Sequence, residues 1–246
     1  MSSCTAQPSS ITSVLFDVDP DDPDEYLYSG VVAIVFEILP TYSNTPVLIH
    51  IGTGFMADNK TIITAAHVYN QDPGAEGTVL SRRAYHGVDI TTSYSDLTSY
   101  LKEYAYSPIK SGIIPTSYEP VTLKNDWFIG VLQSSFYTDH YMFNCSAIDS
   151  SILWEYTYAV GYPHNYAMNM MQSNGKVTAY GVNETHIEVM NLIEVGMSGG
   201  PIYAAVNGRS CIAIICAIDP SNGYGRGTIM TQSMVDLIIN TIVSHD

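Results

Sequence analysis

The sequence predicts an all-β protein, built as one large unit or as two small barrels and followed by a single helix. The 246 residues include 18 glycines and 12 prolines, which mark frequent turns. Between the turns lie short runs of β-branched and aromatic residues, which favour strands. Helical periodicity is convincing only near the C-terminus, over Met234–Val243, where apolar residues recur with the spacing of an amphipathic helix.

Residues 1–25 predict an acidic arm that precedes the strands. Residues 17–25 carry six acidic side chains interrupted by prolines, which favours a solvated segment. A calcium loop is the weaker interpretation, because its turn glycine and spaced terminal glutamate are missing. The first 13 residues lack the basic and apolar regions of a signal peptide. We therefore expect an intracellular protein.

Apolar runs are the clearest candidate strands. They cover residues 31–36, 47–51, 129–132, 152–160, 185–190 and 211–218. No apolar run approaches the roughly 20 residues of a membrane span, so no membrane partner is expected. The polar, tyrosine-rich segment 81–120 reads as a loop packed on its own barrel or as a rim that faces a substrate, with one short helix over 96–104.

The four cysteines, at positions 4, 145, 211 and 216, lack the paired spacing of a metal site. Cys211 and Cys216 lie five apart in one candidate strand, so their side chains should point to opposite faces. We expect no metal, no cofactor and no disulfide framework. On localisation, three Asn-x-Ser/Thr sequons, at Asn59, Asn144 and Asn183, argue weakly for secretion.

The net charge of −15, with only nine lysines and arginines, argues against a nucleic-acid partner, because nucleic-acid surfaces need clustered basic residues. The acidic arm should favour basic or neutral substrate segments over acidic ones.

A first candidate site residue is His67. It follows a strand-turn-strand pattern, Gly-Thr-Gly-Phe-Met-Ala, Asp-Asn-Lys and Thr-Ile-Ile-Thr-Ala-Ala, over residues 52–66. The small residues Ala65 and Ala66 leave room for the imidazole ring against a neighbouring surface. A second candidate is Asp126, which lies at the mouth of the apolar strand 129–132. A partly buried carboxylate there needs a cationic partner, and the imidazolium of His67 is suitable.

The hexapeptide 196–201, Gly-Met-Ser-Gly-Gly-Pro, carries the third candidate, Ser198. Glycine-hinged turns of this kind can aim the N–H groups of Gly196 and Ser198 at one point beside the hydroxyl. That arrangement is an oxyanion hole next to a nucleophile. The alternative is an ordinary Gly/Ser turn between strands.

Taken together, these motifs resemble the chymotrypsin-fold, trypsin-like serine proteases, in which histidine, aspartate and serine follow in this order. The Gly-Tyr-Pro of 161–163 and the Ser-Asn-Gly-Lys-Val of 173–177 are similar to the glutamyl-endopeptidase branch. The resemblance implies that Ser198 is the nucleophile, His67 the general base and then acid, and Asp126 the residue that orients the ring. Asp89 and Asp96 compete for the third role, but neither precedes a continuous apolar strand.

The resemblance also implies two six-stranded antiparallel β-barrels with a C-terminal helix. The implied division is an arm over 1–25, a first barrel over 26–131, a linker over 132–145, a second barrel over 146–232 and a helix over 233–246. The active site would lie between the barrels.

Two departures from the family pattern concern activation and specificity. Met197 stands where trypsin-type enzymes place an aspartate that pairs with a newly cut N-terminus, so activation by that route is not expected. Glutamyl endopeptidases read an acidic side chain with hydroxyl and histidine residues, but Ile193 and Ile215 occupy those places. With Leu192 beside them and Gly227 at the pocket wall, these residues imply an apolar preference before the cut.

The sequence therefore predicts a serine endopeptidase that acts on protein or peptide substrates by acyl transfer. Two alternatives remain open: a catalytically silent binding module with the same fold, and an esterase that uses the same three residues.

Overall fold

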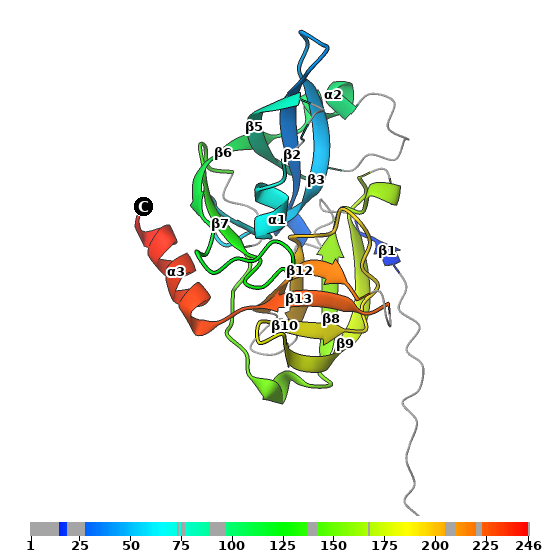
Figure 1. Cartoon of the computed structure of the whole chain (residues 1–246), viewed down its shortest axis with the longest axis vertical. Helices are drawn as coiled ribbons and strands as arrows, with labels where there is room; N and C mark the ends of the chain where they lie inside the picture. Colours follow the sequence, from blue (N-terminus) through cyan, green and yellow to red (C-terminus); the bar gives the residue numbers. More distant parts are fainter. Residues whose placement is uncertain are drawn as a thin grey trace, which may run out of the picture.

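The computed structural model describes residues 15–18, 28–72, 74, 77–88, 97–136, 142–166, 168–204, 210–219 and 223–245. It contains two β-barrels that lie side by side, with the C-terminal helix α3 against the outside of the first (Figure 1). Two closed six-stranded antiparallel barrels and a C-terminal helix confirm the predicted fold class.

The first barrel is a closed ring of six antiparallel strands. In ring order they are β2 (Val31–Pro40), β3 (Val47–Met56), β4 (Thr61–Thr64), β7 (Phe128–Leu132), β6 (Tyr106–Ile113) and β5 (Gly77–His86). The β3–β4 hairpin turns at Asp58, whose carboxylate accepts the Lys60 N–H at 2.9 Å. Such an Asx turn is a common way to close a tight connection between strands.

The second barrel closes in the same way. In ring order its strands are β8 (Tyr156–Gly161), β9 (Met171–Val182), β10 (His186–Val189), β13 (Gly225–Ile229), β12 (Ser210–Ile218) and β11 (Pro201–Ala204). A short strand, β1 (Leu15–Asp17), adds to the edge of β9, where Phe16 pairs with Gln172. An inner part of the predicted acidic arm thus forms a strand. Val18 follows it and donates its N–H to Met170 O at 3.0 Å, and the other residues of the arm lie outside the described residues.

The interpretation of 81–120 as a loop is wrong at residues 81–86 and 106–113, which belong to strands β5 and β6. Polar residues hide these strands in the sequence, but their side chains are paired. The Arg82 guanidinium lies 4.9 Å from the Phe36 ring, and Arg83 pairs with Glu37 on the neighbouring strand. The expected short helix is present as α2 (Leu97–Tyr100), which continues as the 3₁₀ turn η3 (Leu101–Glu103).

Two buried apolar clusters form the core. One fills the first barrel and extends across the contact between the barrels to Tyr162, Met230 and helix α3. The other fills the second barrel and contains Ile193 and Met197. Because one cluster spans both barrels, the two barrels are packed as one unit, and a site between them has a fixed geometry.

Helix α3 (Gln232–Val243) begins at Thr231, whose hydroxyl accepts the Met234 N–H at 3.3 Å as an N-cap. Its buried residues Met234 and Ile238 face the protein, whereas Ile239 and Val243 are exposed. At the far end, His245 Nε2 lies 2.8 Å from Thr61 Oγ1 of β4. The helix therefore leaves the second barrel and ends on the first (Figure 1).

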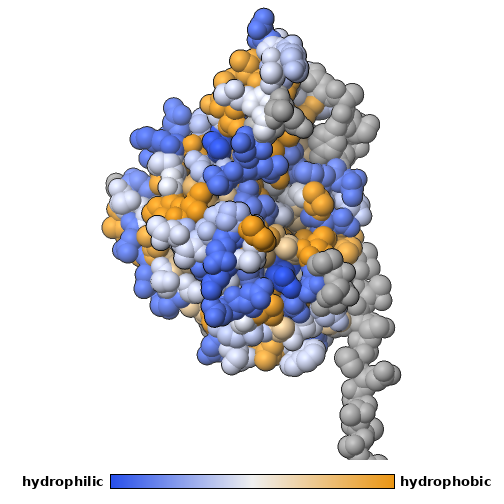
Figure 2. Space-filling model, in the orientation of Figure 1, coloured by the Kyte–Doolittle hydropathy of each residue, from blue (hydrophilic) through white to orange (hydrophobic). Residues whose placement is uncertain are grey.

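On the face shown in Figure 2, hydrophilic side chains surround small, separate apolar patches, as on the surface of most folded proteins. No helix in the described part of the chain is long and apolar enough to cross a membrane. Of the described cysteines, Cys145, Cys211 and Cys216 carry no disulfide.

Candidate active site

Two adjacent strands of the first barrel bring His67 and Asp126 together. Strand β4 ends at Thr64, which pairs with Phe128 at the start of β7. His67 lies three residues after Thr64, on the short helix α1 (Ala66–Tyr69), and Asp126 lies two residues before Phe128. The antiparallel register therefore places both residues at the same end of the barrel.

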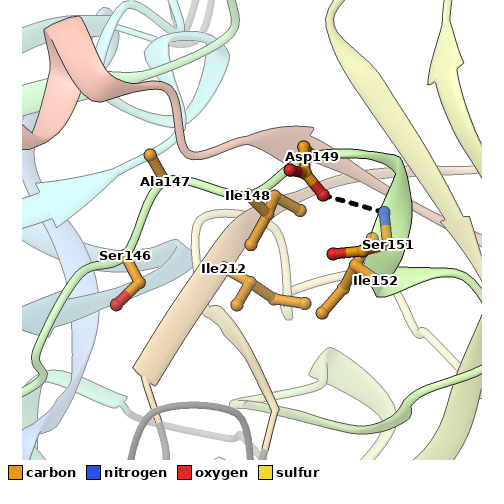
Figure 3. Close-up of a pocket in the computed structure, with 7 residues that line it drawn as sticks. All are labelled: Ser146, Ala147, Ile148, Asp149, Ser151, Ile152 and Ile212. Atoms are coloured by element: carbon orange, nitrogen blue, oxygen red, sulfur yellow. Dashed lines mark hydrogen bonds between the residues drawn. The ribbon is translucent and has the colours of Figure 1, made fainter.

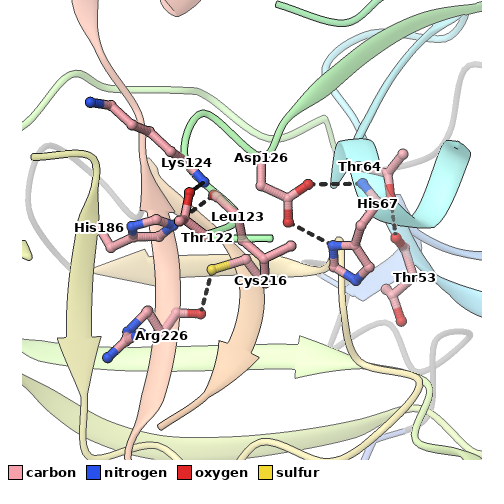
Figure 4. A network of polar contacts seen from close by, with 10 residues as sticks. All are labelled: Thr53, Thr64, His67, Thr122, Leu123, Lys124, Asp126, His186, Cys216 and Arg226. Carbon is pink, nitrogen blue, oxygen red and sulfur yellow. Dashed lines mark hydrogen bonds and ion pairs between the residues drawn. The ribbon is translucent and has the colours of Figure 1, made fainter. Parts of the chain in front are cut away.

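Asp126 contacts His67 at two points. Its Oδ2 lies 2.6 Å from His67 Nδ1, and its Oδ1 accepts the backbone N–H of His67 at 2.8 Å (Figure 4). The Asp126 side chain is completely buried, whereas 28% of the His67 side chain is exposed. A carboxylate held in this way fixes the ring orientation and keeps the proton on Nδ1, so that Nε2 faces outward as a base.

The loop before Asp126 has an unusual backbone. Leu123 and Asn125 have positive φ angles of 55° and 54°, a conformation that costs free energy for residues other than glycine. The Asn125 amide donates to Ser117 Oγ at 2.9 Å. Burial, and then the Asp126 carboxylate, raise the pKa of the neighbouring Tyr118 to about 12, so this phenol stays neutral beside the site.

Two side-chain contacts join this loop to the second barrel. The buried His186, on β10, donates from Nε2 to the Leu123 carbonyl at 2.9 Å, and Lys124 forms an ion pair with Glu184 at 2.7 Å. Burial lowers the pKa of His186, which favours a neutral ring with one donor. The loop that carries Asp126 is therefore anchored to both barrels (Figure 4).

Ser198 belongs to a turn before β11 of the second barrel and packs directly on the first barrel. Its carbonyl accepts the Thr53 N–H of β3 at 2.8 Å. The next residue, Gly199, has a φ of +88°, and a Cβ atom there would lie 2.1 Å from Thr64 Oγ1. Only glycine fits this approach, and the contact places the turn beside the strand that leads to His67.

The carbonyl groups of residues 195–198 all accept a hydrogen bond. The bonds run from His164 N to Val195 O (2.7 Å), from Thr53 Oγ1 to Gly196 O (2.8 Å), from Gly200 N to Met197 O (3.0 Å) and from Thr53 N to Ser198 O (2.8 Å). Because the N–H and C=O of one peptide group point in opposite directions, these bonds also fix the N–H groups of the turn.

The N–H groups of Gly196 and Ser198 have no hydrogen-bond partner in the described part of the chain. Gly196 has a φ of +100°, and a Cβ atom there would lie 2.5 Å from Tyr162 O. Two unpaired donors beside a hydroxyl have the composition of an oxyanion hole. No hydrogen bond joins Ser198 Oγ to His67 Nε2 within the described residues; in free enzymes such bonds are often long and shorten when substrate binds.

The residues predicted to line a specificity pocket lie in or next to the second barrel, where Gly227 pairs with Ile215. Ile193 and Ile215 are buried in the same apolar cluster as Met197, and Leu192 is half-buried. A Cβ atom on Gly227 would point at Ile202 inside the barrel, 2.6 Å from Cδ1. On Gly225 it would lie 2.5 Å from Ile193 Cγ1, so Gly225, which the sequence analysis missed, lies beside the predicted pocket residues.

Asp89 and Asp96, the alternatives to Asp126, lie outside the described residues.

Two further residues, Thr53 and His186, join the two barrels at the site and were not predicted from the sequence. No local pattern marks either residue, because both act through contacts with distant segments. Among the described residues, no group of three or more His, Cys, Asp or Glu side chains is arranged to hold a metal ion.

A separate pocket of about 350 Å³ lies on the second barrel (Figure 3). It is lined by the segment 146–152 and by Ile212 of β12. Its one ionisable group, Asp149, accepts the Ser151 N–H at 2.8 Å and so caps the 3₁₀ turn η4 (Ser150–Ile152). This use of the carboxylate is structural, and the pocket contains none of the predicted site residues.

Comparisons with known proteins agree with the fold. A family model described as Trypsin matches residues 41–238. A solved structure described as "Structure of Glu endopeptidase in complex with MPD" is similar with a TM-score of 0.68 at 12% sequence identity. The match covers 94% of this chain and 97% of that chain, and it shows a shared fold. The comparison with curated proteins found no match.

Proposed function

This chain belongs to the trypsin family, and from that membership we propose that it is a serine endopeptidase with His67, Asp126 and Ser198 as its catalytic residues. The observation that carries the proposal is the two-point contact of the buried Asp126 with His67, at 2.6 and 2.8 Å. A solvated or purely structural histidine does not need a completely buried carboxylate that holds both its ring and its backbone.

In the proposed reaction, Ser198 Oγ attacks the carbonyl carbon of the scissile peptide, and His67 Nε2 takes the hydroxyl proton. Asp126 stabilises the imidazolium that forms. The negative charge on the substrate oxygen is bound by the N–H groups of Gly196 and Ser198. His67 then gives its proton to the amine as the C–N bond breaks. In the second half, His67 takes a proton from water, whose oxygen attacks the acyl carbon, and the proton returns to Ser198 Oγ as the ester bond breaks.

We further propose that the residue before the cut is apolar. Ile193, Ile215 and Leu192 come from the segments on either side of the Ser198 turn and offer no group that could pair a buried carboxylate. Burying an acidic side chain against them would therefore be unfavourable. The close contact of Ile193 with Gly225 makes Ile193 the residue that limits the depth of this pocket.

Labelling with a fluorophosphonate tests the proposal, because the probe reacts with an activated serine and needs no known substrate. Wild-type protein should be labelled at Ser198, and Ser198→Ala should not. Ser146→Ala, on the separate pocket of the second barrel, is a matched control that should label normally. An unlabelled wild type would favour a silent binding module, and cleavage of esters without cleavage of any peptide would favour an esterase.

A further inference from the structure

Thr53 joins the first barrel to the turn that carries Ser198. It lies on β3 and is completely buried. Its backbone N–H donates to Ser198 O at 2.8 Å, and its hydroxyl donates to Gly196 O at 2.8 Å. One residue of the first barrel thus anchors two carbonyls of the turn, and these belong to the two residues whose N–H groups form the proposed oxyanion hole.

The Thr53 hydroxyl uses both of its hydrogen-bonding functions. While its proton is donated to Gly196 O, its oxygen accepts the Tyr162 N–H at 2.9 Å. The hydroxyl therefore links the Ser198 turn to the end of β8 as well as to β3. A threonine hydroxyl has a single proton to donate, so the direction of this chain of bonds is fixed.

The carbonyl of Thr53 is held in turn. It accepts the Thr64 hydroxyl of β4 at 2.6 Å (Figure 4), and β4 leads directly to His67. The side chain of Thr53 therefore bonds the turn of Ser198 directly, while the Thr64 hydroxyl holds Thr53 O and lies against Gly199 of the same turn. Thr61, at the other end of β4, is equally buried, and its hydroxyl lies 2.8 Å from His245 Nε2.

From these contacts we infer that Thr53 is a positioning residue for the oxyanion hole. By binding Gly196 O, its hydroxyl fixes the peptide between Gly196 and Met197. This peptide lies between the two that carry the N–H groups of Gly196 and Ser198, so holding it limits the rotation of both. Its role depends on a side-chain hydroxyl, which the adjacent residues of β3, Gly52 and Gly54, do not have. The inference rests on the proposed function, because a hole has a use only if Ser198 is a nucleophile.

The replacement of Thr53 by valine keeps the shape and removes the hydroxyl, so it leaves Gly196 O and the Tyr162 N–H without this partner. Thr53→Ser keeps the hydroxyl and removes a methyl group. Thr61→Val deletes a hydroxyl of the same kind from a residue that is equally buried, and it leaves both bonds to the turn in place. Thermal unfolding of all three variants measures any loss of stability separately.

The readouts are the rate of fluorophosphonate labelling and, once a peptide substrate is found, kcat and KM. Thr53→Val should slow labelling and lower kcat by about 10- to 100-fold, less than the loss of an oxyanion donor itself, which costs about 10²–10³. KM should change little, because the hole binds the charge that develops in the transition state. Thr53→Ser and Thr61→Val should stay within about threefold of wild type in labelling rate.

Equal rates for Thr53→Val and Thr61→Val, or a Thr53→Ser variant as slow as Thr53→Val, would overturn the inference and leave the proposed function intact. A loss that appears in KM alone would also overturn it, because it would indicate a substrate contact. If wild-type protein is not labelled at all, the proposed function fails and the role of Thr53 fails with it.

Discussion

Asp126 holds His67 twice, through the ring at 2.6 Å and through the backbone N–H at 2.8 Å. One carboxylate thereby positions both the imidazole and the segment that carries it. The two oxygens have the same chemical character only while the group is an ionised carboxylate, since an amide presents one acceptor and one donor.

Asp126→Asn should therefore lower the rate by about 10⁴. If the amide oxygen keeps the backbone N–H of His67, its NH₂ group faces Nδ1 and favours the wrong ring tautomer. The measurement is kcat/KM on a cleaved peptide, with Asp149→Asn, on the separate pocket, as the control. Near-normal activity of Asp126→Asn would return Asp89 or Asp96 to the role.

Ser198→Ala and His67→Ala should each reduce turnover by about 10⁶, and the double variant should be little slower than either. The two side chains act in one proton transfer, so the loss of one makes the other useless. Single-turnover assays on the three variants, with circular dichroism to check folding, measure this. Losses that multiply in the double variant would point to a different nucleophile.

Met197→Asp should destabilise the protein, because Met197 is completely buried in an apolar cluster with Ile193 and Ile215. An unpaired carboxylate there costs several kcal/mol, whereas Met197→Leu conserves volume and should cost under about 1.5 kcal/mol. Urea unfolding measures both.

The 246-residue chain should be active without removal of residues 1–25, because Met197 cannot form an ion pair with a newly cut N-terminus. An assay that finds activity only after such removal would contradict this expectation.

Ile193→Ala should widen the proposed pocket beside Gly225. Each methylene buried by a substrate contributes about 0.8 kcal/mol, so cleavage after phenylalanine should rise several-fold relative to cleavage after alanine. A peptide-library profile measures the ratio. Ile202→Val, behind Gly227 in the barrel core, should leave the ratio unchanged. Dominant cleavage after glutamate by wild-type protein would contradict the apolar pocket.

Acid should destabilise the fold through His50. Burial, and then the neighbouring His164, lower the pKa of His50 to about 3, from about 6.5 in an unfolded chain. Between these values the unfolded chain binds a proton that the folded chain excludes, so the free energy of unfolding falls as pH falls, by up to about 1.4 kcal/mol per pH unit.

The test is urea unfolding of wild type and His50→Phe from pH 7.5 to 5. The variant lacks the titrating group, so its stability should fall less steeply below about pH 6. At pH 7.5 the difference between the two proteins measures packing and the lost bond to Gly52 O. Parallel curves over the whole range would show that His50 does not titrate in this way.

The sequence was most informative where the determinants of a structure are local. The glycines around Ser198 and the small residues before His67 belong to single turns, and their neighbours suffice to predict those turns. Strand β5 was missed because Arg82 and Arg83 make it look solvated. The Phe36 ring and Glu37 that accommodate these charges lie on β2, which neighbours β5 in the barrel but is distant in the sequence.

Gly225, which lies next to Ile193 in the fold, escaped notice for a related reason. It pairs with Ile218 of β12, and Gly227 pairs with Ile215, with a register shift between Ile215 and Ala217. Register is set by pairing, which no single strand encodes. Thr53 and His186 escaped notice because each acts across the contact between the barrels.

The path of α3 links the order of the chain to its assembly. His245, two residues after the helix, contacts Thr61 on the first barrel, although the helix follows the second barrel in the chain. If the protein is expressed as two fragments cut between the barrels, the first fragment lacks helix α3, which packs on it in the intact chain. The two fragments should associate and restore activity only when the second fragment retains this helix, which would then bind the first barrel in trans.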